Sequence, residues 1–169
     1  MKKPRLSSRV RSLIGIGDDE RVITWGIGNQ VSDEPCYVVA TNKALYEQVS
    51  DQRIPWEAIA KGTWEQPDFI IDFQAEEGSG MRRLRIRLED PRDLPAAVRD
   101  RVVDTVVISE YRELSEDAGA YFVARRSPGG GVDDIRWSVV FDAGLDPNNA
   151  ELRAKADDVL EGLRSSLGI

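Results

Sequence analysis

The stretch ALYEQVSDQRIPWEAIA (residues 44–60) decides the fold of this chain. A β-type segment enters a polar turn at residues 50–52, and the segment that follows ends at Pro55. Proline fixes φ and has no amide hydrogen to donate, so this second strand is expected to be short, at an edge or at a bend. The apolar side chains expected to meet at that corner are Leu45, Ile54, Trp56 and Ile59.

Short segments rich in β-branched and aromatic residues extend the sheet on both sides. They read RVITWGIG, CYVVAT, AKGTWE, DFIIDFQ and RRLRIRL, at residues 21–28, 36–41, 60–65, 68–74 and 82–88. About seven short strands in some seventy residues are typical of a small barrel or sandwich. A helix is then predicted over residues 93–105, with Asp93 as its N-cap and Leu94, Val98 and Val102 on its inner face.

The rest of the chain predicts three strands and a final helix. The strands are expected at residues 106–111, 120–126 and 135–142, and the helix at 147–167, with Asp146 as its cap. The predicted fold class is α+β: a bent antiparallel β-barrel with a capping helix, a three-strand extension and a C-terminal helix. The expected domains are a basic arm with a short helix (1–17), the barrel and its helix (18–105) and the extension (106–169).

The order of these motifs resembles that of bacterial pleckstrin-homology-like domains over residues 18–105. These domains commonly show a Thr-Asn-x-x-Leu turn followed by an Arg-Ile-Pro-aromatic-x-x-Ile segment. The matching residues are Thr41, Asn42, Leu45, Arg53, Ile54, Pro55, Trp56 and Ile59. In relatives that bind phosphoinositides, basic residues cluster in the first hairpin loop. Here that loop carries Asp33 and Glu34 and no base, so we do not expect a polyphosphate head group there.

The composition excludes several classes of site. The 169 residues include no histidine, which excludes Ser-His-Asp triads, Cys-His dyads and histidine metal sites. The single cysteine forms no intrachain disulfide. The sequence indicates no catalytic residue, no metal site and no cofactor, although chemistry by a pair of carboxylates stays open as a third hypothesis. The absence of a signal peptide and of a long apolar segment predicts a cytoplasmic protein.

An arginine row is the most functional-looking feature. Arg83, Arg85 and Arg87 share one strand face, with neighbours about 6.8 Å apart, close to the spacing of phosphates. Asp72 and Asp68 on the preceding strand face them, Asp72 near Arg83 or Arg85 and Asp68 near Arg87. Two readings stay open: a cross-strand ladder of ion pairs, or contact with an anion or a partner protein.

Three more residues are candidate contacts. Arg125 and Arg126 precede a glycine-rich turn, where they contact an anion or simply belong to a hairpin. Trp64 lies in a polar setting and is the best candidate for an exposed interface anchor among the tryptophans, for which core packing is the default.

The charge is unevenly distributed along the chain. Residues 1–15 hold five bases and no acid, whereas the remainder holds 18 bases and 30 acids. The acidic body disfavours specific binding to nucleic acid. We expect a non-catalytic module that binds a partner protein or a second copy of itself. The alternative is peripheral contact with anionic lipid through the arm, whose bases are Lys2, Lys3, Arg5, Arg9 and Arg11.

Overall fold

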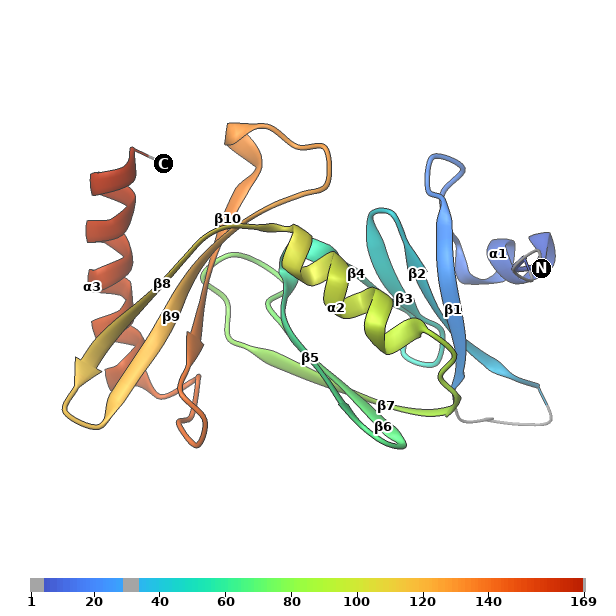
Figure 1. Cartoon of the computed structure of the whole chain (residues 1–169), viewed down its shortest axis with the longest axis horizontal. Coiled ribbons are helices and arrows are strands. Elements are labelled where there is room, and N and C mark those ends of the chain that lie inside the picture. The colour runs from blue at the N-terminus through green and yellow to red at the C-terminus, as the bar shows by residue number, and fades with distance from the viewer. Residues whose placement is uncertain (1–4, 29–33, 169) are drawn as a thin grey trace.

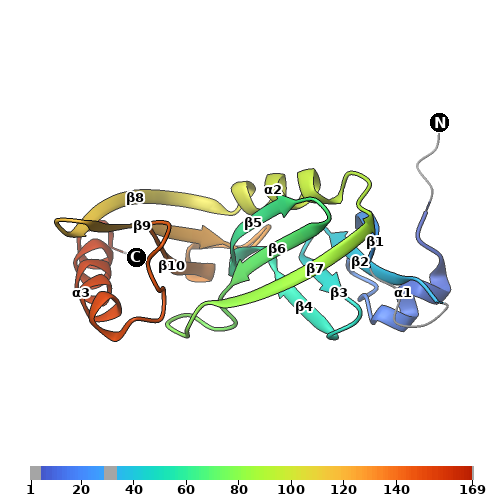
Figure 2. The same cartoon turned by 90° about the horizontal axis from the view of Figure 1, so that it is seen from below.

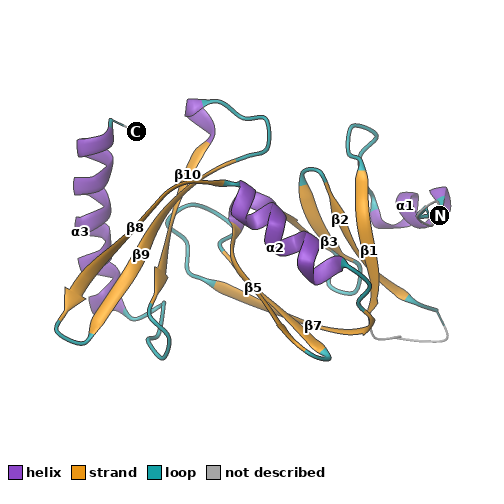
Figure 3. Ribbon diagram, in the orientation of Figure 1, coloured by secondary structure: helices purple, strands orange, loops and turns teal. Residues whose placement is uncertain are grey.

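The computed structural model describes residues 5–28 and 34–168. They form an α+β protein with two antiparallel sheets side by side along the long axis, each packed with a helix of its own (Figures 1 and 3). The larger sheet has seven strands: β1 (Val22–Gly28), β2 (Cys36–Thr41), β3 (Ala44–Glu47), β4 (Gln52–Pro55), β5 (Ile59–Glu65), β6 (Asp68–Phe73) and β7 (Arg82–Asp90). The smaller sheet has three: β8 (Val106–Ser115), β9 (Ala118–Arg126) and β10 (Ile135–Phe141). The helices are α1 (Ser8–Ile14), α2 (Leu94–Asp104) and α3 (Ala150–Leu167), with short 3₁₀ turns η1 (Trp56–Ala58) and η2 (Val132–Asp134).

The seven strands follow the order β4-β3-β2-β1-β7-β6-β5 and form an open, bent sheet. The expected closed barrel is not formed by the described strands, because β4 and β5 stand at opposite ends of this order. The reason lies at the corner in residues 44–60. Strand β4 has only four residues and ends at Pro55, which has no amide hydrogen, and η1 then turns the chain directly into β5.

The predicted corner cluster is confirmed. Leu45, Ile54, Trp56 and Ile59 are each at most 2% exposed and belong to one core cluster with Leu94, Val98 and Val102 of α2. The indole Nε1 of Trp56 donates to the carbonyl oxygen of Thr41 at 2.9 Å, so this buried side chain leaves no polar atom unpaired. Helix α2 lies across one face of this sheet in Figure 1, and the view turned by 90° shows it along one side of the strands (Figure 2).

A glycine allows α2 to begin close to β1. A Cβ at Gly26 would lie 3.1 Å from the carbonyl oxygen of Asp90 and 3.2 Å from Leu94 Cδ2. These contacts are tighter than side chains normally tolerate, so a residue with a side chain here would push α2 away from the sheet.

Helix α3 covers one face of the smaller sheet. Phe122, Trp137 and Leu163 are buried between them, and partly buried side chains surround this small cluster. The helix begins at Ala150, three residues later than predicted. Asn149 is its cap, because its side chain accepts from the amides of residues 151 and 152, both at 3.1 Å.

Helix α1 and a buried carboxylate complete the larger unit. Leu6 and Ile14 pack on the outer side of β2 and β3, whereas Leu13 is 64% exposed. Glu20 is buried and accepts from Thr41 Oγ1 at 2.6 Å and from Arg53 Nη2 at 2.6 Å. Burial alone would raise the pKa of Glu20, but hydrogen bonds from Thr41, Arg53 and Tyr46 outweigh it and hold the pKa below its usual value.

Candidate functional site

The arginine row forms a ladder, although its pairs differ in part from those predicted. Arg83 Nε lies 2.7 Å from Asp72 Oδ1, and Arg85 Nη1 lies 2.9 Å from Asp68 Oδ2. Asp68 was expected to pair with Arg87, its direct cross-strand neighbour, but it pairs diagonally with Arg85. Arg87 makes no ion pair with any described residue and is exposed. The anion or partner contact therefore stays a prediction, with Arg87 as the member that makes no ion pair with a described residue.

The two arginines before the glycine-rich turn have different surroundings. Arg126 is exposed, whereas Arg125 is only 4% exposed. The Arg125 guanidinium donates to the carbonyl oxygens of Val102 at 2.9 Å and Ala60 at 3.1 Å, and to Thr105 Oγ1 at 3.0 Å. Burial lowers the pKa of Arg125 to about 10, so the side chain stays charged at neutral pH. Its donors join β9 to the end of α2 and to β5, a structural role that the hairpin interpretation did not include.

Trp64 and the described part of the basic arm also have contacts inside the chain. Trp64 is half-buried and packs edge-on against Phe69, with ring centroids 6.3 Å apart. Arg5 and Arg9 are exposed, but Arg11 donates to the carbonyl oxygens of Gly17 and Glu20. Lys2 and Lys3 lie outside the described residues. These residues are not brought together into one site.

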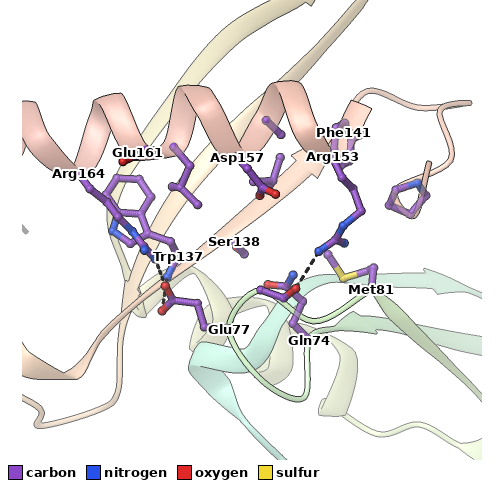
Figure 4. Close-up of a pocket in the computed structure, with 15 residues that line it drawn as sticks. Gln74, Glu77, Met81, Trp137, Ser138, Phe141, Arg153, Asp157, Glu161 and Arg164 are labelled. Carbon is purple, nitrogen blue, oxygen red and sulfur yellow. Dashed lines mark hydrogen bonds and ion pairs between the residues drawn. The ribbon is translucent and has the colours of Figure 1, made fainter. Parts of the chain in front are cut away.

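A cavity of about 480 Å³ lies where the loop between β6 and β7 meets β10 and α3 (Figure 4). We call it the seam pocket, because it lies between the two sheets. Its volume is in the range of sites that bind small molecules or single side chains. Its apolar lining consists of Met81, Trp137, Val139, Phe141, Pro147, Ala156 and Leu160.

Polar contacts hold the β6–β7 loop against α3 and β10. Glu77 forms an ion pair with Arg164, and Arg153 Nη2 donates to the carbonyl oxygen of Gly78 at 2.8 Å, as the dashed lines in Figure 4 show. Arg136 Nη2 donates to the carbonyl oxygen of Ala75 at 2.7 Å. Both arginines of α3 take part in these contacts. They hold the loop against the helix on both sides of the pocket and so define its shape.

Besides Arg164, whose Nε has no partner although its Nη2 pairs with Glu77, three buried residues that line the pocket each have one buried polar atom without a hydrogen-bond partner in the described chain: Gln74 Oε1, Trp137 Nε1 and Ser138 Oγ. The three residues are 8%, 3% and 7% exposed, respectively. Leaving such an atom unpaired costs about 1–3 kcal/mol, so native proteins satisfy nearly all of them. In contrast, the buried Glu20 is fully surrounded by donors from its own chain. Together these three atoms carry two donors and two acceptors without a partner, since a hydroxyl serves as both.

Two carboxylates of α3 also line the pocket, on the same helix as Arg153 and Arg164. Asp157 and Glu161 lie one helical turn apart on α3, line the pocket and make no ion pair with a described residue. Figure 4 shows the Asp157 side chain on the side of α3 that faces β10 and the loop. Within the described ranges, no group of three or more histidine, cysteine, aspartate or glutamate side chains is arranged to hold a metal ion. The same ranges contain no helix with the length and hydropathy needed to cross a bilayer.

No family model, no curated protein and no solved structure matches this chain. The case for the seam pocket therefore depends on its own geometry. Sequence reasoning missed Gln74, Ser138 and Asp157, which are spread over 84 positions of the chain. The strand at 135–142 and the last helix are predicted from the sequence, but nothing in the sequence indicates that the loop between β6 and β7 packs against them.

Proposed function

We propose that this chain is a non-catalytic binding module that takes a short segment of a partner protein into the seam pocket. The observation that carries this proposal is the set of three buried, unpaired polar atoms of Gln74, Trp137 and Ser138 beside an apolar wall. Such atoms gain most when a ligand supplies their missing hydrogen bonds in a site shielded from water.

A segment of polypeptide matches this set of groups. Its backbone carries an amide donor for Gln74 Oε1 and a carbonyl acceptor for Trp137 Nε1, while Ser138 Oγ pairs with either. An apolar side chain of the segment would contact Phe141 and Leu160, and its burial contributes about 25 cal/mol per Å². Polar anchors and apolar contact area together give a peptide both register and affinity.

The carboxylates of Asp157 and Glu161 favour a basic residue in that segment. Asp157 and Glu161 form no ion pair with a described residue, whereas Arg153 and Arg164 are already engaged with the loop. A lysine or arginine on the partner would meet these two carboxylates, and like charge would disfavour an acidic segment. The expected ligand is therefore a short segment with a basic residue next to an apolar one.

The resemblance to pleckstrin-homology-like domains supports a binding role without naming a ligand. The proposal that residues 18–105 belong to that family is supported by seven antiparallel strands followed by a helix that packs on the corner cluster. The seam pocket lies outside that region on two of its three sides, β10 and α3. Contact with anionic lipid through the arm stays an untested alternative, and the engagement of Arg11 with two carbonyl oxygens does not favour it.

The proposal is tested with a random heptapeptide library displayed on phage and selected against the whole chain. We expect the enriched peptides to carry a lysine or arginine beside an apolar residue. A fluorescein-labelled copy of one such peptide is then titrated by fluorescence polarisation, and the indole resonance of Trp137 is followed by ¹⁵N NMR. Binding is expected to shift that resonance, because Trp137 Nε1 gains a hydrogen bond.

A charge reversal separates the pocket from the rest of α3. Asp157→Lys is expected to weaken binding of the peptide by about tenfold, because one of two attractive charges becomes repulsive. Asp158→Lys is the matched control, since this neighbouring residue is exposed and does not line the pocket. Equal effects of the two variants, or a selection without enriched peptides, would overturn the proposal.

A further inference from the structure

The free edge of the smaller sheet lies on β8. Strand order β10-β9-β8 leaves one side of β8 without a neighbouring strand, and at ten residues it is the longest edge strand of the two sheets as described. Figure 2 shows it along one margin of the molecule. Long edges with open backbone groups are natural sites for pairing with another strand. This edge lies on the opposite side of the sheet from β10 and the seam pocket.

The sequence of β8, VVISEYRELS, is self-complementary in one antiparallel register. When Tyr111 faces Tyr111 of a second copy, Glu110 faces Arg112 and Arg112 faces Glu110. In the same register Ser109 faces Glu113 and Ile108 faces Leu114. Every pair between residues 108 and 114 is therefore ionic, hydrogen-bonding, apolar or aromatic, which are the favourable cross-strand combinations.

The neighbouring registers lack this match. Two-fold symmetry requires a residue to face its own copy, so the closest alternatives are centred on Glu110 or Arg112. The first places Glu110 against Glu110, and the second places Arg112 against Arg112. Like charges directly opposite one another are destabilising, so charge selects the register centred on Tyr111.

The local structure leaves the edge of β8 at Tyr111 accessible to a second strand. The hydroxyl of Tyr111 donates to Asp142 Oδ2 at 2.8 Å, and its ring packs against Tyr121 at 5.2 Å between centroids. The tyrosine therefore leans across its own sheet, over Gly119, where a Cβ would lie 2.0 Å from the hydroxyl oxygen. Irregularities in pairing with β9 fall at residues 106–108 and 113–115, so the most regular part of β8 is centred close to Tyr111.

We propose that two copies of this chain associate along β8 in the register centred on Tyr111 and form one continuous six-stranded sheet. Seven facing residues from each copy would add about six to eight backbone hydrogen bonds. Glu110 and Arg112, which already pair within one chain at 2.5 Å, then form a network of four charges across the two-fold axis. The same charges oppose other registers and other partners. This association is independent of the seam pocket.

The test measures molar mass by sedimentation velocity over a range of concentrations. The wild-type chain is expected to approach twice 18.9 kDa as concentration rises. Arg112→Glu places Glu110 opposite glutamate at two positions, and Glu110→Arg places Arg112 opposite arginine. Each single variant is expected to associate about tenfold more weakly or worse.

Mixing distinguishes a lost interface from a damaged fold. A chain with Glu110→Arg and a chain with Arg112→Glu are complementary, so their equimolar mixture is expected to form heterodimers. The double variant Glu110→Arg with Arg112→Glu is expected to recover self-association. Arg126→Glu, an exposed reversal on β9, is the control and should leave the mass unchanged. A wild-type chain that stays monomeric at every concentration, or a mixture without heterodimers, would overturn the proposal.

Discussion

The two sheets of this molecule are completed in different ways. Among the described residues, the cluster around α2 holds fifteen buried apolar side chains, including Trp56 and Phe69. The cluster around α3 holds six, and a larger number of partly buried side chains surrounds them. The smaller sheet also depends on polar ties to the β6–β7 loop, such as the one between Arg164 and Glu77.

The two sheets also differ in how many of their buried polar groups are paired within the chain. The larger sheet pairs the buried polar groups of Glu20 and Trp56 internally, although Glu57 Oε2 and Gln74 Oε1 have no partner among the described residues. The smaller sheet leaves polar atoms of Trp137 and Ser138 unpaired, and its strand β8 is the longest edge strand of the two sheets as described. Such incomplete regions are where binding surfaces are found, because a partner gains by completing them.

The largest expected effect is in the corner cluster of the larger sheet. Trp56→Ala should lower the free energy of unfolding by about 3–5 kcal/mol, because it removes a fully buried indole and leaves a cavity. Urea denaturation measures this change. Trp64→Ala, at a half-buried position, is the control variant and should lower the free energy of unfolding clearly less than Trp56→Ala. If the two variants lowered the free energy of unfolding by similar amounts, the corner cluster would not be the part of the core that contributes most to stability.

The corner was predictable from sequence because its signals are local. Pro55, the polar turn before it and the apolar residues on both sides dictate a bend whatever lies elsewhere. The open form of the sheet was not predictable, since closure depends on whether two distant edges meet. The same holds for the seam pocket, which combines Gln74 with Ser138 and Asp157 across three separate elements.

The next largest effect is expected at Arg125, whose hydrogen bonds connect β9 of the smaller sheet to α2 and β5. Arg125→Met should lower the free energy of unfolding by about 2–3 kcal/mol, because three hydrogen bonds of a buried charged group are lost. Thermal denaturation with Arg126→Met as the control checks this. If Arg126→Met lowered the melting temperature as much as Arg125→Met, Arg125 would not be the residue that joins β9 to α2.

A smaller effect is expected at Glu20 and depends on pH. Glu20→Gln should cost about 1–2 kcal/mol at neutral pH, since the hydrogen bonds of Arg53 and Thr41 lose their charged acceptor. The pKa of Glu20 is lower in the folded chain, so its contribution is complete above about pH 4.5 and is lost as the pH falls through the folded-state value. Urea unfolding at a series of pH values should show the gap between variant and wild type closing in acid. Glu116→Gln, in the exposed β8–β9 turn, is the control, and a gap that persists in acid would contradict the assignment.

The smallest effect is expected in the arginine ladder. Arg83→Ala should cost less than about 1 kcal/mol, because its ion pair with Asp72 is largely exposed to solvent. The melting temperature measures this loss, which should shrink at high salt. If the variant also changed self-association or peptide binding, the row would have a contact role in addition to its pairing with Asp72 and Asp68.

The comparison between the two regions is tested most directly by native-state hydrogen exchange, resolved by segment. We expect amides of β2, β3 and β6 to exchange only through global unfolding, with the full free energy of the protein. Amides of β8, β10 and α3 should exchange through a separate opening of lower free energy, because their core is smaller and depends on polar ties. A single opening free energy shared by both groups of amides would contradict this account.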